Sequence, residues 1–117
     1  MSFQAGKTYE LKAKVLLENS CYQIVAENFH SRMGEIDIIA LIKDVLVFVE
    51  VKYRYSRNYG HVLETITASK RKKLIKTAQF FLLRYPQYSQ CQLRFDVIAF
   101  EKDQYYWIED AFSAAVF

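Results

Sequence analysis

Apolar residues near the start of the chain recur at the spacing of an amphipathic helix. Leu11, Val15 and the neighbouring Leu16 and Leu17 are placed so that they gather on one side of a helical turn, with charged residues between them. This pattern predicts a helix over residues 8–19.

A longer apolar stripe predicts a second helix between Glu64 and Tyr85. Pro86 should end this helix, because proline lacks the backbone N–H that would continue it. The apolar positions recur at i, i+4, i+7, i+8 and i+11, which places them on one helical face. They are Leu74, Ala78, Phe81, Leu82 and Tyr85.

Apolar stretches of strand length surround the second helix. The second and third of these stretches, residues 36–42 and 45–53, should be joined by a turn at Lys43-Asp44. We infer this turn from the stretches on either side of it, because the dipeptide itself is a weak hairpin signal. A short helix is expected over residues 110–116. The order helix, three strands, helix, two strands implies one small α/β domain over residues 1–117, with a mixed sheet flanked by helices. The predicted strands are residues 22–28, 36–42, 45–53, 93–100 and 105–108.

The composition is typical of a small globular protein. A chain of 117 residues with 52% hydrophobic residues can bury one core, and three glycines with one proline leave little room for linkers. The charged N-terminus lacks the apolar segment of a secretory signal, and no apolar run approaches the roughly 20 residues of a membrane helix. Cys21 and Cys91 lack metal-ligand spacing, so we expect reduced thiols, a cytoplasmic protein and no membrane partner.

Basic residues are concentrated in one segment. Residues 52–76 hold eight basic residues against one acidic residue, Glu64, whereas the rest of the chain holds eight basic and twelve acidic residues. The net charge of +3 is too small to indicate nucleic-acid binding by itself, but this asymmetry favours a polyanionic partner. A solvated basic helix face is the alternative explanation.

Ionisable residues interrupt the two most apolar predicted strands. Asp37 lies within GEIDIIA, and Glu50 and Lys52 lie within VFVEVKYR. Because side chains alternate along a strand, Glu50 and Lys52 share one face, as Glu35 and Asp37 do. If the two strands pair as antiparallel neighbours, Asp37 can lie opposite Glu50. An unpaired buried charge is costly, so the cluster needs a compensating partner.

Two compensations fit this cluster. Lys52 can form a buried ion pair with Asp37 or Glu50, although such pairs rarely improve on an apolar core. Alternatively, the carboxylates can hold a hard cation such as Mg²⁺, which prefers oxygen ligands and retains water, while Lys52 faces a phosphate. The following segment KYRYSRNY favours the second explanation, because Arg54 and Arg57 can contact phosphates and its tyrosines can stack on bases.

A second cationic cluster is SKRKK, at residues 69–73. If its helix begins near Thr67 or Ser69, these cations crowd the positive end of the helix dipole, which disfavours each by roughly a few tenths of a kcal/mol. An anionic partner then explains them better, whereas a helix that begins near Glu64 would weaken the argument. The nucleic-acid contacts expected here are Lys70, Arg71, Lys72 and Lys73.

GEIDIIA followed by VFVEVKYR resembles the YraN family of small bacterial proteins, which is related to archaeal Holliday-junction resolvases. Both belong to the PD-(D/E)xK, or restriction-endonuclease-like, superfamily. The resemblance covers nearly the whole chain, including RFDV at residues 94–97 and AF at residues 111–112. It implies a restriction-endonuclease-like fold and hydrolysis of phosphodiester bonds with Mg²⁺ or Mn²⁺ as cofactor. Kinship with resolvases further implies branched or other non-B DNA as substrate, in preference to RNA, and a homodimer for that role.

The resemblance also implies roles for individual residues. Asp37 and Glu50 match the two metal carboxylates, and the backbone carbonyl of Val51 matches a further ligand. Lys52 matches the lysine that orients or activates the attacking water. Glu10 matches a helix glutamate that holds a second metal ion or its waters.

Some ionisable residues have simpler explanations. Lys14 follows Glu10 by four residues, so an ordinary helix ion pair explains Glu10 almost as well as metal binding does. Glu35 is expected in a solvated salt bridge at the end of its strand. Asp96 is expected to pair with Arg94, two residues away on the same strand.

Three functions are compatible with these residues. The first is a metal-dependent endonuclease, and the second is a module that binds nucleic acid or a partner nuclease without cutting. The third is an interaction domain with a buried ion network. The complete acid-acid-lysine set favours the first, because a site that has lost its activity has no need to keep buried charges.

Overall fold

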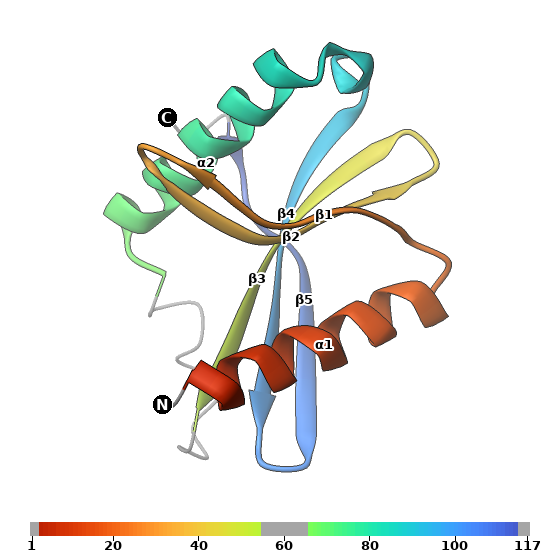
Figure 1. Ribbon diagram of the computed structural model, residues 1–117, viewed down its shortest axis with the longest axis vertical. Helices are drawn as coiled ribbons and strands as arrows, with labels where there is room; N and C mark the ends of the chain where they lie inside the picture. Colours follow the sequence, from red (N-terminus) through yellow and green to blue (C-terminus); the bar gives the residue numbers. More distant parts are fainter. Residues whose placement is uncertain (1–2, 55–65, 115–117) are drawn as a thin grey trace.

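A five-stranded mixed sheet forms the centre of the molecule, with helices on both faces (Figure 1). The computed structural model describes the backbone of residues 3–54 and 66–114, and the side chains of residues 6–53 and 66–114. The elements in chain order are α1 (Phe3–Asn19), β1 (Gln23–Ser31), β2 (Gly34–Ile42), β3 (Val45–Arg54), α2 (Ala68–Arg84), the 3₁₀ helix η3 (Pro86–Tyr88), β4 (Gln92–Glu101) and β5 (Gln104–Phe112).

The strands lie in sequence order across the sheet, β1-β2-β3-β4-β5. Neighbouring strands are antiparallel except β3 and β4, which are parallel from Val45↔Gln92 to Arg54↔Glu101. A parallel pair needs a crossover, and α2 lies in the connection between β3 and β4. The predicted α/β class with a mixed sheet is therefore confirmed, and the arrangement is that of a restriction-endonuclease-like fold.

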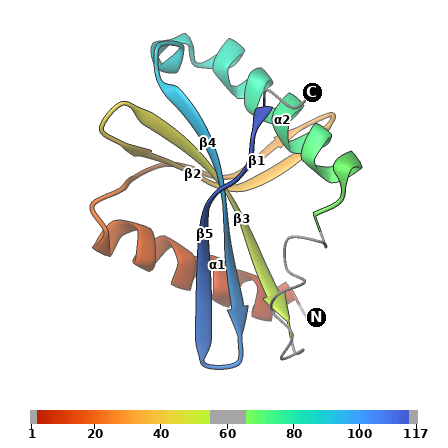
Figure 2. The ribbon, with the colours of Figure 1, turned by 180° about the vertical axis from the view of Figure 1, so that it is seen from behind.

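Each face of the sheet is covered by one helix (Figures 1 and 2). On one face α2 packs through Leu74, Ile75, Ala78 and Phe81, so the predicted stripe of this helix is buried. Leu82 and Tyr85 complete that stripe and are partly buried against the same core.

The buried face of α1 differs from the predicted one. Leu11 and Val15 are 61% and 46% exposed, whereas Ala13 and Leu17 are fully buried against the sheet. Leu16 is partly buried beside them. The helix contacts the sheet along a narrow stripe that includes a small alanine. The sequence pattern did not indicate this stripe, because larger apolar residues lie on either side of it.

The boundaries of α2 follow local chemistry. The Thr67 side chain accepts a hydrogen bond from the Lys70 backbone N–H, which caps the start of the helix. The helix ends at Arg84, just before Tyr85 and Pro86, as the proline predicted. The first turn holds no acidic residue, so the SKRKK cations do lie at the positive end of the helix dipole.

The short helix predicted over residues 110–116 is wrong for residues 110–112. Strand β5 continues to Phe112, whose ring stacks on Phe95 with 4.9 Å between centroids. Asp110 adopts φ 53° where the register between β4 and β5 shifts, and its N–H donates to the Asp96 carboxylate at 3.0 Å. Pairing with β4 thus holds this segment extended. Residues 115–117 lie outside the described residues.

Asp96 is almost completely buried, at 1% exposure, and both of its oxygens are hydrogen-bonded. Arg94 donates from Nε and Nη2 to the two carboxylate oxygens at 2.9 and 2.8 Å, which confirms the predicted pair. Trp107 Nε1 donates to the same carboxylate at 2.9 Å. This network explains the charge on β4 without catalysis and ties β5 to β4.

Cys21 and Cys91 are free thiols. Among the helices of the described residues, none is long and apolar enough to span a membrane.

Candidate active site

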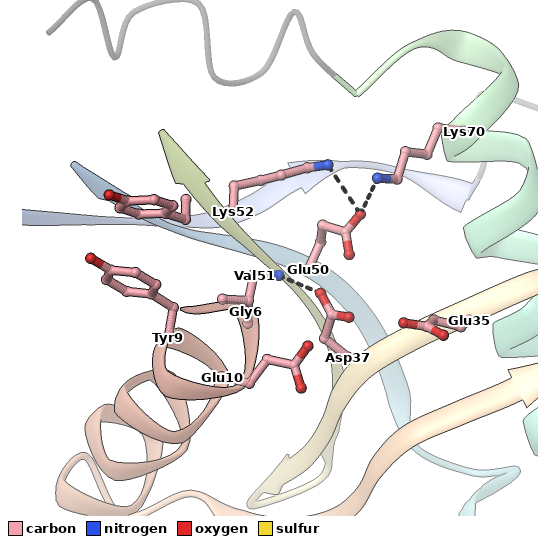
Figure 3. A pocket seen from close by; sticks show the side chains of 10 residues that line it. Gly6, Tyr9, Glu10, Glu35, Asp37, Glu50, Val51, Lys52 and Lys70 are labelled. Atoms are coloured by element: carbon pink, nitrogen blue, oxygen red, sulfur yellow. Dashed lines mark hydrogen bonds and ion pairs between the residues drawn. The ribbon is translucent and has the colours of Figure 1, made fainter. Parts of the chain in front are cut away.

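The pairing of β2 with β3 stops one residue short of the acidic cluster. The last register pair is Ile38↔Val49, and beyond it the Asp37 side chain replaces a backbone acceptor. Its Oδ2 accepts a hydrogen bond from the Val51 N–H at 2.8 Å. A pocket of about 340 Å³ opens at this point between α1, β2, β3 and the start of α2 (Figure 3). Its ionisable residues are Glu10, Glu35, Asp37, Glu50, Lys52 and Lys70.

A coordinated irregularity in β1 and β2 directs Asp37 into this opening. Ile36 packs in the core under α2, whereas Ile38, two residues later, packs in the core under α1. Regular alternation would place both on one face, so the strand changes phase at Asp37. On β1, Asn28 lies opposite Asp37 and adopts φ 52°, a left-handed conformation that asparagine tolerates well. The two distortions together allow the carboxylate to face β3.

Glu10 enters the pocket from α1, and its carboxylate lies on the Asp37 side of the opening (Figure 3). Partial burial raises the pKa of Glu10, while a hydrogen bond with the Asn28 side chain acts in the opposite direction. Lys14 forms its ion pair with Glu27, at 3.2 Å, so the expected helix pair with Glu10 is replaced by a contact to β1.

Two lysines converge on the Glu50 carboxylate (Figure 3). Lys70 Nζ, from the first turn of α2, lies 2.7 Å from Glu50 Oε2, and Lys52 Nζ lies 3.7 Å from the same oxygen. Asp37 and Glu50 are each only 7% exposed. The buried ion pair expected between Lys52 and Glu50 is thus present in the structure, and Lys70 contributes a second cation that the sequence suggested only as a nucleic-acid contact.

The pKa values of the two buried carboxylates shift in opposite directions. Burial and the hydrogen bond with Glu50 raise the pKa of Asp37 to about 9. Burial also acts to raise the pKa of Glu50, but the hydrogen bonds with Asp37 and Lys70 outweigh it and lower that pKa. Burial, together with the neighbouring Lys70, lowers the pKa of Lys52. A cation bound between two such carboxylates can take the place of the proton for which they compete.

The donor atoms suit a hard divalent cation that keeps part of its water shell. Val51 directs its N–H at Asp37, and since N–H and C=O of one strand residue point to the same side, its carbonyl faces the same opening. Within residues 3–54 and 66–114, no group of three or more His, Cys, Asp or Glu side chains is gathered closely enough to hold a metal ion alone. Two carboxylates, one carbonyl and retained waters are nevertheless a ligand set that Mg²⁺ accepts.

Most of the chain, including the acidic and basic residues of this pocket, is similar to proteins of one family. A family model described as "Uncharacterised protein family UPF0102" matches residues 9–100. The chain belongs to the UPF0102 family. It is 50% identical to a UPF0102 protein of Acinetobacter baumannii (strain AYE) over 101 residues, which cover 86% of this chain and 76% of the relative. It is 43% identical to a UPF0102 protein of Francisella tularensis subsp. tularensis (strain WY96-3418) over 112 residues, which cover 95% and 96%.

The match confirms the resemblance drawn from GEIDIIA and VFVEVKYR, because both segments lie within the matched residues of the UPF0102 model. Glu10, Asp37, Glu50, Lys52 and Lys70 all lie there too. The pocket of this UPF0102 chain is therefore built from the part that carries the family relationship.

The structure separates the expected nucleic-acid contacts of this UPF0102 chain into different groups. Lys70 lies in the acidic pocket, while Arg71 donates from Nε to the Ile66 carbonyl at 3.0 Å and so supports the approach to α2. Lys72 and Lys73 are exposed on α2. The side chain of Arg54, and Arg57 as a whole, lie outside the described residues.

One contact near the pocket was not predicted from the sequence. Tyr9 on α1 stacks on Tyr53 of β3 with 4.2 Å between ring centroids, which fixes the first turns of α1, and hence Glu10, beside β3. Their separation by more than forty residues left no signal in the sequence. Glu35 was expected in a solvated salt bridge, and its Oε2 lies 3.1 Å from His30 Nδ1 on the partly exposed edge of the pocket.

The raised pKa of Asp37 predicts a pH dependence for the metal-free UPF0102 chain. Asp37 has an ordinary pKa of 3.8 and a folded pKa of about 9, so between these values the folded state holds a proton that the unfolded state releases. Stability should therefore fall as pH rises, by at most about 1.4 kcal/mol per pH unit. Urea unfolding in EDTA between pH 6 and pH 9 should show this decline, and Asp37→Asn should reduce it. Equal slopes for both proteins would contradict the raised pKa of Asp37.

Proposed function

We propose that this chain is an endonuclease that uses Mg²⁺ or Mn²⁺ to hydrolyse phosphodiester bonds in nucleic acid, in DNA rather than RNA. One observation carries the proposal: Asp37 and Glu50 are buried side by side where a strand pair opens, with the Val51 backbone and Lys52 at the same opening. An apolar core has no use for such a group, whereas phosphodiester hydrolysis needs each member of it.

Asp37, Glu50 and the Val51 carbonyl are the proposed ligands, and Glu10 is placed to hold a second ion or an ordered water. When bound, a divalent cation would act as a Lewis acid and lower the pKa of the attacking water, so that this water could ionise at neutral pH. Lys52 orients the attacking water and offsets negative charge on the phosphoryl oxygens. Its lowered pKa, caused by burial and by Lys70, leaves a larger fraction of the amine neutral, and so free to accept a proton, than in an exposed lysine. Hydrolysis then adds water across one P–O ester bond, and the leaving oxygen takes up a proton.

Branched DNA is the proposed substrate, on the basis of the similarity to resolvases. A four-way junction presents paired strands, so cutting both in one encounter requires two active sites. A homodimer belongs to this proposal for that reason.

Calorimetry and cleavage together test the proposal. Mn²⁺ should bind and raise the melting temperature of the wild-type chain, because a ligand that binds only the folded state stabilises it. In Mn²⁺ the wild type should cut a labelled four-way junction or single strand, and Glu50→Ala should not. Equal cleavage by the wild type and Glu50→Ala would assign the activity to a contaminant.

A second candidate is a module that binds nucleic acid, or a partner nuclease, without cutting. The 2.7 Å ion pair between Lys70 and Glu50 favours it, since this contact satisfies Glu50 without a metal ion. Strongly salt-dependent DNA binding with no heat on addition of Mn²⁺ would support this candidate over the endonuclease.

A further inference from the structure

A second pocket, of about 370 Å³, lies where the turn between β1 and β2 meets the outer side of α2. Among the described residues that line it, four are cations and none is acidic. Two elements supply them, so the pocket depends on the folded arrangement and not on one run of basic residues. Its lining is Arg32, Met33, Ser69, Lys72, Lys73 and Lys76.

The α2 residues of this pocket form one helical face. Ser69, Lys72, Lys73 and Lys76 are spaced at i, i+3, i+4 and i+7, which brings them together along the helix. Like charges at this spacing repel one another, so the stripe costs stability unless an anion is present. Within the described residues, none of these three lysines forms an ion pair with an acidic side chain.

Arg32 is held beside this stripe by contacts that fix the β1–β2 turn on α2. Ser31 Oγ and Thr77 Oγ1 are hydrogen-bonded at 3.0 Å, and Thr77 Oγ1 also donates to the Lys73 carbonyl at 2.8 Å. Gly34 adopts φ 156°, and a Cβ at this position would already be 3.5 Å from Thr77 Oγ1. The turn therefore lies closely against the helix, and the cation cluster is arranged before any ligand binds.

We propose that this cluster binds a backbone phosphate of the nucleic-acid substrate, away from the phosphate that is cut. The inference rests on nucleic acid being the partner in the proposed function. It is distinct from the catalytic pocket, in which Lys70 and Lys52 face Glu50. Here the cations are exposed to solvent, as contacts to a phosphate require, and the part of the chain that the structure describes pairs none of them with an acid.

The spacing along α2 sets the register of this contact. Lys73 and Lys76 follow Lys70 by three and six residues, or about 4.5 and 9 Å of helix rise. One strand of DNA carries a phosphate about every 3.4 Å along the axis. The bound phosphate should therefore lie about one to three nucleotides from the bond that faces Lys70 and Lys52.

Binding to a fluorescein-labelled DNA duplex and a four-way junction, measured by anisotropy in EDTA over a range of salt concentrations, tests this inference without cleavage. Arg32→Gln should weaken binding about tenfold and lower the slope of log K against log salt by about 0.9. Arg84→Gln is the matched control: it makes the same charge change on an exposed residue at the far end of α2, and should alter binding less than about twofold.

Lys76→Gln should repeat the effect of Arg32→Gln, and melting temperatures should show that both variants are folded. Methylphosphonate substitution, which removes the charge of one phosphate, should weaken the wild type at one position and leave Arg32→Gln unaffected there. Equal losses for Arg32→Gln and Arg84→Gln, or no such position, would overturn the phosphate site even if the wild type cuts DNA in Mn²⁺. A selective loss for Arg32→Gln would support the site even if no cleavage occurs.

Discussion

Lys52→Met should lower the rate of Mn²⁺-dependent DNA cleavage by at least about a thousandfold while leaving Mn²⁺ binding intact. The methionine keeps the length and packing of the side chain but removes the amine that faces Glu50 at 3.7 Å. The carboxylates and the Val51 carbonyl are unchanged, and one repulsive positive charge is lost, so the affinity for Mn²⁺ should stay equal or rise. Initial rates on a labelled junction and calorimetry with Mn²⁺ measure the two effects separately.

Lys43→Met is the control for this variant. Lys43 is an exposed lysine in the turn between β2 and β3, at the opposite end of β3 from Lys52. Its replacement should leave cleavage within about twofold of the wild type, as is usual for surface changes. If Lys52→Met retained a tenth or more of the wild-type rate, Lys52 would not be the catalytic lysine. If it lost Mn²⁺ binding instead, its role would lie in holding the ligands in place.

The largest effect on stability is expected for Asp96→Ala, at about 3–5 kcal/mol. This change leaves Arg94 and Trp107 without their acceptor and removes the bond that holds Asp110 in β5. Hydrogen bonding to Asp96 raises the pKa of Arg94. Arg94 stays charged after the substitution all the same, because a guanidinium is not deprotonated in proteins even at its ordinary pKa. A partly buried charge that loses its buried partner, and keeps only the exposed Glu109 as an acidic partner, is what makes this substitution costly. Urea unfolding measures the loss, and the melting temperature should fall by more than about 10 °C.

Glu109→Ala serves as the matched comparison. Glu109 pairs with the same Arg94 at 3.2 Å, but its side chain is 61% exposed, so its removal should cost less than about 1 kcal/mol. Similar losses for the two variants would show that burial of Asp96 does not strengthen the pair. A loss below about 1 kcal/mol for Asp96→Ala would show that water replaces the carboxylate.

Most of the fold could be predicted because its signals are local. The strand predicted over residues 45–53 corresponds to β3, at Val45–Arg54, and the second helix ends before Pro86 as expected. The C-terminal segment could not be predicted in this way. Residues 110–112 are held extended by Asp96 and Phe95 on β4, and no local preference of the segment itself indicates that contact.

The candidate site was predicted in part. Asp37, Glu50, Val51 and Lys52 lie on two strands joined by a tight turn, so the sequence could predict that they lie close together, but not that the Asp37 side chain faces β3. The involvement of Lys70 could not be predicted, because it depends on where the crossover returns α2 to the sheet.

The sequence by itself determined the order of helices and strands, the acid-acid-lysine cluster and the family, since each is written in residues close together along the chain. Tertiary structure alone decided that Asp37 turns towards β3, that Asn28 meets Glu10, and that Arg32 joins the lysines of α2. These contacts join residues on different elements. Their geometry is set by the twist, phase and packing of the sheet, which no local pattern of hydrophobic and polar residues specifies.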